Sequence, residues 1–224
     1  MHKQNHTLDR FHHLILWEKW VLANAVASII CLFLIATVSK NSYQGNINSH
    51  SILLFVASCN GIVFGSAQWL VLRFYVRNAF WWIPATILGT FVSTLVITFL
   101  SFILAFVIGL QPTLVSTQNL YFFVASIGAI AGAVLGLLQG IVLKALFNTT
   151  INQVGWWLVA NALAWSLGIL IAFIGVGIHN QEVFNLKTIL ISTSTAATVG
   201  SIVGIITAIA LIFILKVVVF SKNN

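Results

Sequence analysis

Four side-chain amides lie inside otherwise apolar stretches of this chain, at positions that repeat. Gln68 in GIVFGSAQWLVLR and Gln139 in GAVLGLLQGIVLK each follow two glycines that are four residues apart. Asn24 and Asn161 each follow a tryptophan by four residues. A carboxamide both donates and accepts hydrogen bonds. Such a set can therefore bond helices to one another or bind a polar solute.

Two threonines extend the same pattern. Thr86 follows Trp82 by four residues, and Thr207 occupies the glutamine position in a weaker third copy, GSIVGIITAIALI. We expect a single polar layer, made of Asn24, Gln68, Thr86, Gln139, Asn161 and Thr207. Two interpretations of this layer are open. The favoured one is hydrogen bonding between helices, which contributes about 0.6 kcal/mol per bond on average in membranes. The other is a substrate or ion site where repeats meet.

The chain that must position these residues is far more apolar than a soluble protein. Of its 224 residues, 60% are hydrophobic and 6% are charged, with a mean hydropathy of +1.05. Soluble domains carry about 25% charged residues. A spanning helix needs about 20 apolar residues, and six stretches qualify: 17–39, 51–76, 79–109, 120–147, 155–177 and 188–219. The predicted fold is an all-α membrane protein with six transmembrane helices.

The six stretches alternate between two types, which indicates an internal repeat. One type opens with tryptophan, and the other carries the glycines and the glutamine. We therefore expect three repeated helical hairpins in one bundle, at about 17–80, 81–150 and 155–220. Together they form a single transmembrane domain, 17–219, between a cytoplasmic segment at 1–16 and a cytoplasmic tail at 220–224.

Glycines at four-residue spacing indicate where helices pack closely, because small residues let backbones approach one another in lipid. The expected packing residues are Gly61, Gly65, Gly128, Gly132, Gly136, Gly140, Gly200 and Gly204. Four of them form a stripe on the fourth stretch. We expect that helix to be the most buried of the six.

The distribution of lysine and arginine predicts orientation through the positive-inside rule. With six crossings, eight of these residues lie on the side of both termini and two lie on the other side. Both termini are therefore expected in the cytoplasm, with the protein in the plasma membrane. Tryptophans concentrate at membrane interfaces, so we expect a belt made of Trp17, Trp20, Trp81, Trp82, Trp156 and Trp157.

This sequence contains few residues of the types that usually catalyse reactions. The acidic residues are Asp9, Glu18 and Glu182, all outside the predicted membrane core. Histidines occur only near the N-terminus and in predicted outer loops, and the two cysteines do not form a metal-binding motif. We expect no catalytic residues, no bound metal and no cofactor. The chain is predicted not to be an enzyme.

The pattern GxxxGxxQWLVLR followed by AxWWxxA resembles a group of small polytopic membrane proteins associated with cyanobacteria and related bacteria. The resemblance covers most of the chain from residue 17 and implies a six-span fold. It also implies a thylakoid location as an alternative to the plasma membrane. It implies no activity.

Two functions from different classes remain. The favoured one is a non-catalytic membrane scaffold or regulator that acts through a partner protein, through lipid or through self-association. The alternative is a small-solute transporter, a channel or a substrate-binding membrane subunit that uses Asn24, Gln68, Gln139 and Asn161. Nucleic acid is not an expected partner, because the basic residues lie at the ends of the apolar stretches.

Overall fold

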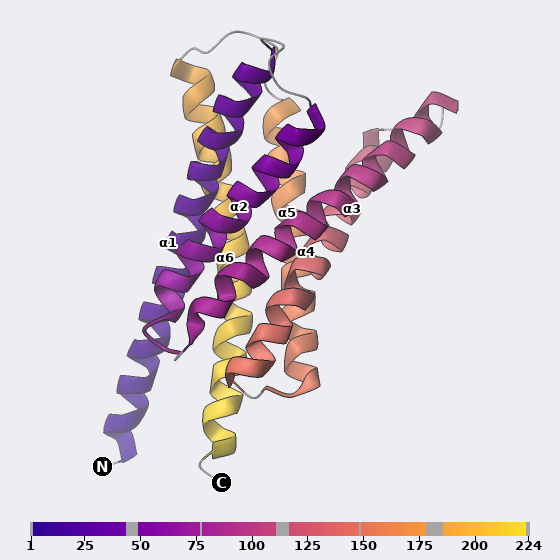
Figure 1. The fold of residues 1–224 in the computed structure, drawn as a ribbon. Coiled ribbons are helices and arrows are strands. Elements are labelled where there is room, and N and C mark those ends of the chain that lie inside the picture. The colour runs from indigo at the N-terminus through magenta and orange to yellow at the C-terminus, as the bar shows by residue number, and fades with distance from the viewer. Residues whose placement is uncertain are drawn as a thin grey trace.

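The computed structural model describes residues 2–43, 49–76, 78–110, 117–147, 149–177 and 186–222. Within these ranges the chain is helical and contains no strand. The elements are α1 (His2–Tyr43), α2 (Ser49–Leu72), the 3-10 helix η1 (Ala79–Trp81), α3 (Trp82–Leu110), α4 (Thr117–Phe147), α5 (Ile151–Gly177) and α6 (Leu186–Lys222). Figure 1 shows them as one bundle.

Five of the helices contain described stretches that are long and apolar enough to cross a membrane. These stretches are Leu14–Thr37, Ala79–Ile103, Gln118–Leu146, Ile151–Gly175 and Lys187–Leu215. In α2 the corresponding stretch, Val56–Leu72, is shorter. The prediction of an all-helical protein with several helices of membrane-spanning length is confirmed. A sixth span stays a prediction.

Two helix boundaries differ from the expected ones for local reasons. Helix α5 begins at Ile151 rather than at residue 155, because Thr150 and Gln153 form a capping box. The Thr150 N–H donates to Gln153 Oε1 at 2.7 Å, and the Gln153 N–H donates to Thr150 Oγ1 at 3.4 Å. Helix α2 ends at Leu72, where a turn begins, and Asn78 then adopts a left-handed conformation with φ 65°. Asparagine tolerates that region better than most residues.

The six helices form a closed ring. Each helix packs against its neighbours in the chain, and α6 returns to pack against α1. The ring closes through glycines of α2, α4 and α6, which contact α3, α5 and α1 respectively. A Cβ atom at Gly61 would lie 2.6 Å from Ile87 Cα, and one at Gly204 would lie 2.8 Å from Val21 Cα. These helices approach one another at backbone distance.

Both termini lie at the same end of the bundle, together with the α2–α3 and α4–α5 connections (Figure 1). At that end Lys19 and Arg73 both contact the ring of Phe74, with distances of 5.6 and 4.8 Å to its centroid. Toward the opposite end, α3 leans away from α1 and α2 (Figure 1). The outer half of α3 is correspondingly exposed, as at Phe99 and Phe102.

Helix α4, which we expected to be the most buried, shares the highest burial with α6 among the five membrane-length stretches. Nine of the 29 residues in Gln118–Leu146 are buried, and nine of the 29 residues in Lys187–Leu215 are buried as well. Each of these helices packs against both of its neighbours in the ring. The four glycines of the α4 stripe therefore did not make α4 more buried than α6, which has two glycines at its contact with α1.

Candidate functional site

Three tryptophans meet on the axis of the ring and form the centre of the candidate site. Trp20, Trp82 and Trp157 come from α1, α3 and α5, and each has an exposed fraction of 0%. Their ring centroids are 5.6–6.3 Å apart, and all three pairs meet edge to face. This is the favoured geometry for aromatic pairs. We call this group the tryptophan triangle.

The tryptophan triangle corrects the predicted interfacial belt. The six predicted belt residues come as three pairs close in sequence, and the second member of each pair is buried in the core. Of the first members, Trp81 and Trp156 are exposed at 64% and 60%. Trp17 is half-buried. The sequence carried a usable signal that the belt interpretation overlooked. Trp20 and Asn24 are four residues apart and so share one helix face, which means that a buried amide implies a buried tryptophan.

The polar layer surrounds the tryptophan triangle, and all six of its members are buried. Their exposed fractions run from 0% to 6%: Asn24, Gln68, Thr86, Gln139, Asn161 and Thr207. Five of the six take part in hydrogen bonds between helices. Asn161 instead donates to Trp157 O in its own helix, at 3.0 Å.

Gln68 is the centre of the hydrogen-bond network. Its Nε2 donates to Asn24 Oδ1 at 2.9 Å, and its Oε1 accepts from Trp82 Nε1 at 2.8 Å. The same oxygen accepts from Gln139 Nε2 at 3.3 Å. Gln139 also donates to Thr86 Oγ1 at 3.1 Å. One side chain of α2 therefore bonds to α1, α3 and α4.

The tryptophan indoles extend the network to α6 but not to every helix. Trp20 Nε1 donates to Thr207 Oγ1 at 2.9 Å, which connects α1 with α6. The corresponding nitrogen, Trp157 Nε1, is buried and has no hydrogen-bond partner among the described residues. A buried donor without a partner costs about 1–3 kcal/mol. Helix α5 is held instead by ring packing and by the glycines of α4.

Residues four positions after each central tryptophan bond back to its carbonyl oxygen. Asn24 donates to Trp20 O and Thr86 donates to Trp82 O, both at 2.8 Å. Asn161 does the same with Trp157 O. Each amide or hydroxyl group thus donates one hydrogen bond within its own helix. The interhelical bonds then use the remaining capacity of Asn24 and Thr86 as acceptors.

The predicted packing glycines lie at contacts between helices, and several of them touch residues of this layer. Gly128, Gly132, Gly136 and Gly140 face α5; Gly61 and Gly65 face α3; Gly200 and Gly204 face α1. A Cβ atom at Gly136 would lie 2.9 Å from Asn161 Cβ, and one at Gly204 would lie 3.2 Å from Asn24 Cβ. The glycine-packed pairs α2–α3 and α6–α1 are the ones joined by the Trp82–Gln68 and Trp20–Thr207 hydrogen bonds. The amide–amide bonds join other helix pairs, α1–α2 and α2–α4.

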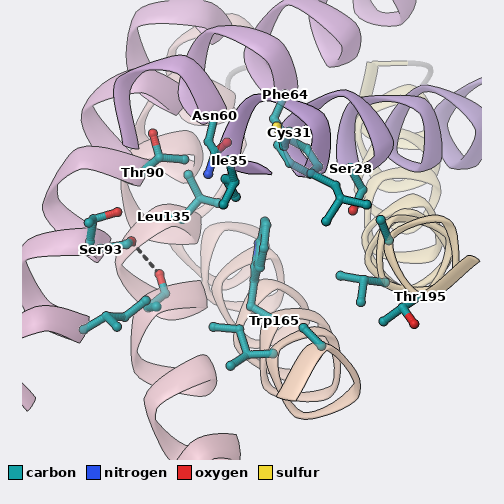
Figure 2. Close-up of a pocket in the computed structure, with 18 of the residues that line it drawn as sticks. Ser28, Cys31, Ile35, Asn60, Phe64, Thr90, Ser93, Leu135, Trp165 and Thr195 are labelled. Carbon is teal, nitrogen blue, oxygen red and sulfur yellow. Dashed lines mark hydrogen bonds between the residues drawn. The ribbon is translucent and has the colours of Figure 1, made fainter. Parts of the chain in front are cut away.

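A cavity begins one helical turn from the polar layer, on the side away from the chain termini. Its volume is about 450 Å³. All six helices contribute to its lining. Ser28, Phe64, Thr90, Leu135 and Trp165 each lie four residues from a layer residue of the same helix. Figure 2 shows these side chains around the cavity, with Asn60 and Ser93 beside them.

Titratable groups contribute little to the described part of this site. No cluster of three or more histidine, cysteine or acidic residues that could hold a metal occurs among the described residues. Glu18 is exposed. The other acidic residues and the histidines lie outside the residues whose side chains are described: Asp9, Glu182, His2, His6, His12, His13, His50 and His179. The chemistry of the layer is neutral hydrogen bonding.

No family model matches the chain, and no significant match was found among curated proteins or solved structures. The resemblance to small cyanobacterial membrane proteins therefore stays a prediction.

Proposed function

We propose that the chain is a non-catalytic membrane scaffold or regulator with six spans, built from three repeated hairpins around a structural polar layer. Helix α2 has 24 residues and a length of about 36 Å, which exceeds the roughly 30 Å of a bilayer core. Both termini lie at one end of the bundle (Figure 1), as six crossings require. These features support a sixth span in addition to the five longer ones.

The repeat is supported by equivalent contacts in each hairpin. Each hairpin supplies one tryptophan to the tryptophan triangle. The residue four positions later bonds back to that tryptophan. The glycine face of each second helix packs against the next hairpin. Three hairpins related in this way close a ring without a soluble domain.

Orientation in the membrane follows from the basic residues. Eight lysines and arginines belong to the side of the termini and two to the opposite side, which assigns both termini to the cytoplasm. The plasma membrane of a bacterium is the proposed location, and the thylakoid is the alternative in a cyanobacterium.

One observation carries the proposed structural role of the layer. Each of the four amide nitrogens donates to an oxygen of the chain itself, and each amide residue is at least 94% buried. A solute site built from these amides would need polar groups that face an accessible space. The layer instead holds five helices to one another, which favours a scaffold that acts through its outer surface on a partner protein or on lipid.

The experiment is affinity purification of the tagged chain from its host in a mild detergent, with mass spectrometry of the co-eluting material. We expect a stoichiometric membrane protein or a second copy of the chain. The matched variant is Gln139→Leu, which removes layer hydrogen bonds without changing the outer surface. The Gln139→Leu chain should still co-purify with the partner at temperatures at which the variant is folded. A polar solute that co-elutes with the unmodified chain and is lost from the folded variant would contradict the scaffold and favour transport.

A further inference from the structure

Two basic side chains share one aromatic ring at the end of the bundle where the termini lie. Lys19 Nζ is 5.6 Å and Arg73 Cζ is 4.8 Å from the centroid of the Phe74 ring. Arg73 Cζ is also 5.4 Å from the centroid of the Trp69 ring. Lys19 belongs to α1, and the other three residues belong to the last turn of α2 and the turn that follows it. We call these four residues the basic–aromatic cluster.

The positive charge of this cluster is not neutralised within the described part of the chain. Lys19 and Arg73 are both exposed, and neither side chain forms an ion pair or a hydrogen bond with another described residue. Glu18 directly precedes Lys19, but adjacent residues of a helix point about 100° apart. Cation–π contacts hold the two cations against the rings and leave their N–H groups able to donate. Two like charges on one ring repel each other, so an anion that contacts both would stabilise the arrangement.

The surroundings of the cluster are partly apolar. Leu22 and Val26 follow Lys19 by three and seven residues and so lie on the same face of α1. They are 65% and 45% exposed, and Phe74 is 67% exposed. A ligand here would meet two cations at its polar end and an exposed apolar helix face beside them. A phospholipid has this distribution of charge and apolar surface, whereas a soluble anion such as inorganic phosphate does not.

The second hairpin of the proposed repeat supplies a comparison. Lys144 corresponds to Arg73, because each follows its motif glutamine by five residues. Ala145 follows Lys144 where Phe74 follows Arg73, and the position that corresponds to Lys19 is a tryptophan. The second hairpin therefore has one cation at this level and no shared ring. The positive-inside rule applies equally to both hairpins, so a difference in lipid binding between them would belong to the cluster itself.

From these observations we propose that the basic–aromatic cluster binds the phosphate of an anionic phospholipid, with an acyl chain along Leu22 and Val26. The Arg73 guanidinium donates to two phosphate oxygens, and the Lys19 ammonium supplies the second charge. This proposal rests on the proposed function, because it names the class of lipid that the outer surface of the scaffold contacts. It needs the membrane embedding of the chain but no protein partner.

The test uses the purified full chain in a neutral detergent and native mass spectrometry, which resolves each bound lipid by its mass. The micelles contain equal amounts of phosphatidylglycerol, which is anionic, and phosphatidylcholine, which is zwitterionic, with the same acyl chains. We expect the unmodified chain to retain phosphatidylglycerol preferentially. Lys19→Gln and Arg73→Gln should each weaken phosphatidylglycerol binding about fivefold, as the loss of one cation near a membrane surface does. Phosphatidylcholine binding should stay unchanged.

Lys144→Gln is the matched control, because it removes the same charge from an exposed position at the same end of the bundle. It should keep the preference for phosphatidylglycerol. Equal losses in Lys144→Gln and Arg73→Gln would overturn the proposal, because they would assign the preference to net charge. An unmodified chain without a preference would overturn it as well, whatever the variants do. Melting curves verify that each variant is folded.

A competition experiment distinguishes the lipid from a soluble anion. Glycerol phosphate carries the same phosphate without acyl chains, and we expect it not to displace phosphatidylglycerol. Displacement at millimolar concentration would overturn the assignment to a lipid. Failure of the scaffold is recognised separately, since it would appear as a co-eluting polar solute and not as a loss of lipid preference.

Discussion

Trp82 Nε1 donates a 2.8 Å hydrogen bond to Gln68 Oε1 across the contact between α3 and α2. Both side chains are buried, with exposed fractions of 0% and 6%. Neither partner can exchange this bond for one with water. The pair joins the tryptophan triangle to the polar layer, so changes at either residue should affect the stability of the whole ring.

The two glutamines of the repeated motif should differ in their importance. Gln68→Leu leaves the Trp82 indole and Asn24 Oδ1 without their bonds. We expect it to lower the free energy of unfolding by about 2 kcal/mol or more, because buried unsatisfied groups cost about 1–3 kcal/mol each. Gln139→Leu removes the two hydrogen bonds that Gln139 donates to Gln68 Oε1 and Thr86 Oγ1, and it leaves no buried N–H group without an acceptor. It should lower the free energy of unfolding by about 1 kcal/mol. Unfolding in mixed micelles measures both. Gln118→Leu, at an exposed position of α4, is the control and should be neutral.

The indoles of the tryptophan triangle should also be unequal. Trp82→Phe loses a hydrogen bond and leaves Gln68 Oε1 with fewer donors. Trp157→Phe removes a nitrogen that has no partner among the described residues. Both changes lose similar ring area, so Trp82→Phe should be the more destabilising by about 1 kcal/mol. The comparison is made on melting temperatures in one detergent. An equal or reversed order would show that Trp157 Nε1 has a partner in the folded protein.

Glycine substitutions test the close packing of α4 on α5. A Cβ atom at Gly132 would lie 2.9 Å from both Asn161 C and Trp165 Cβ, so Gly132→Ala forces the helices apart. We expect a loss of about 1–3 kcal/mol, as for other overpacked sites. Gly155 has no neighbouring atom within 4 Å of such a Cβ. Gly155→Ala should therefore be neutral or stabilising, because alanine favours helix. Unfolding curves of the two variants decide this.

The topology prediction is six spans with both termini in the cytoplasm. Reporter fusions after residues 45, 77, 115, 150, 183 and 224 should alternate between an external and a cytoplasmic signal, starting outside. The same reporter expressed alone in the cytoplasm calibrates the internal signal. An external signal at residue 224 would mean that one helix, with α2 the first candidate, does not span the membrane.

The sequence predicted the helical architecture because hydrophobic length alone requires it in lipid. It also predicted that the amides are neighbours, since Gln68 and Gln139 share a motif at matched positions and are bonded at 3.3 Å. It did not predict which tryptophan of each pair enters the core, because the belt interpretation considered depth and ignored helix phase. The cavity could not be predicted either. Its lining comes from all six helices, so it depends on how they pack together, a tertiary property that no local sequence pattern records.

The central claim is that the polar layer is structural. The most direct test pairs two measurements on Gln68→Leu and Gln139→Leu: melting temperature in detergent, and rescue of the defect that deletion of the chain causes in its host. If the layer holds the helices together, rescue should fall in the same order as stability, with Gln139→Leu close to the unmodified chain at low temperature. Loss of rescue in a variant whose melting temperature is unchanged would contradict the account, because it would assign the amides to a solute.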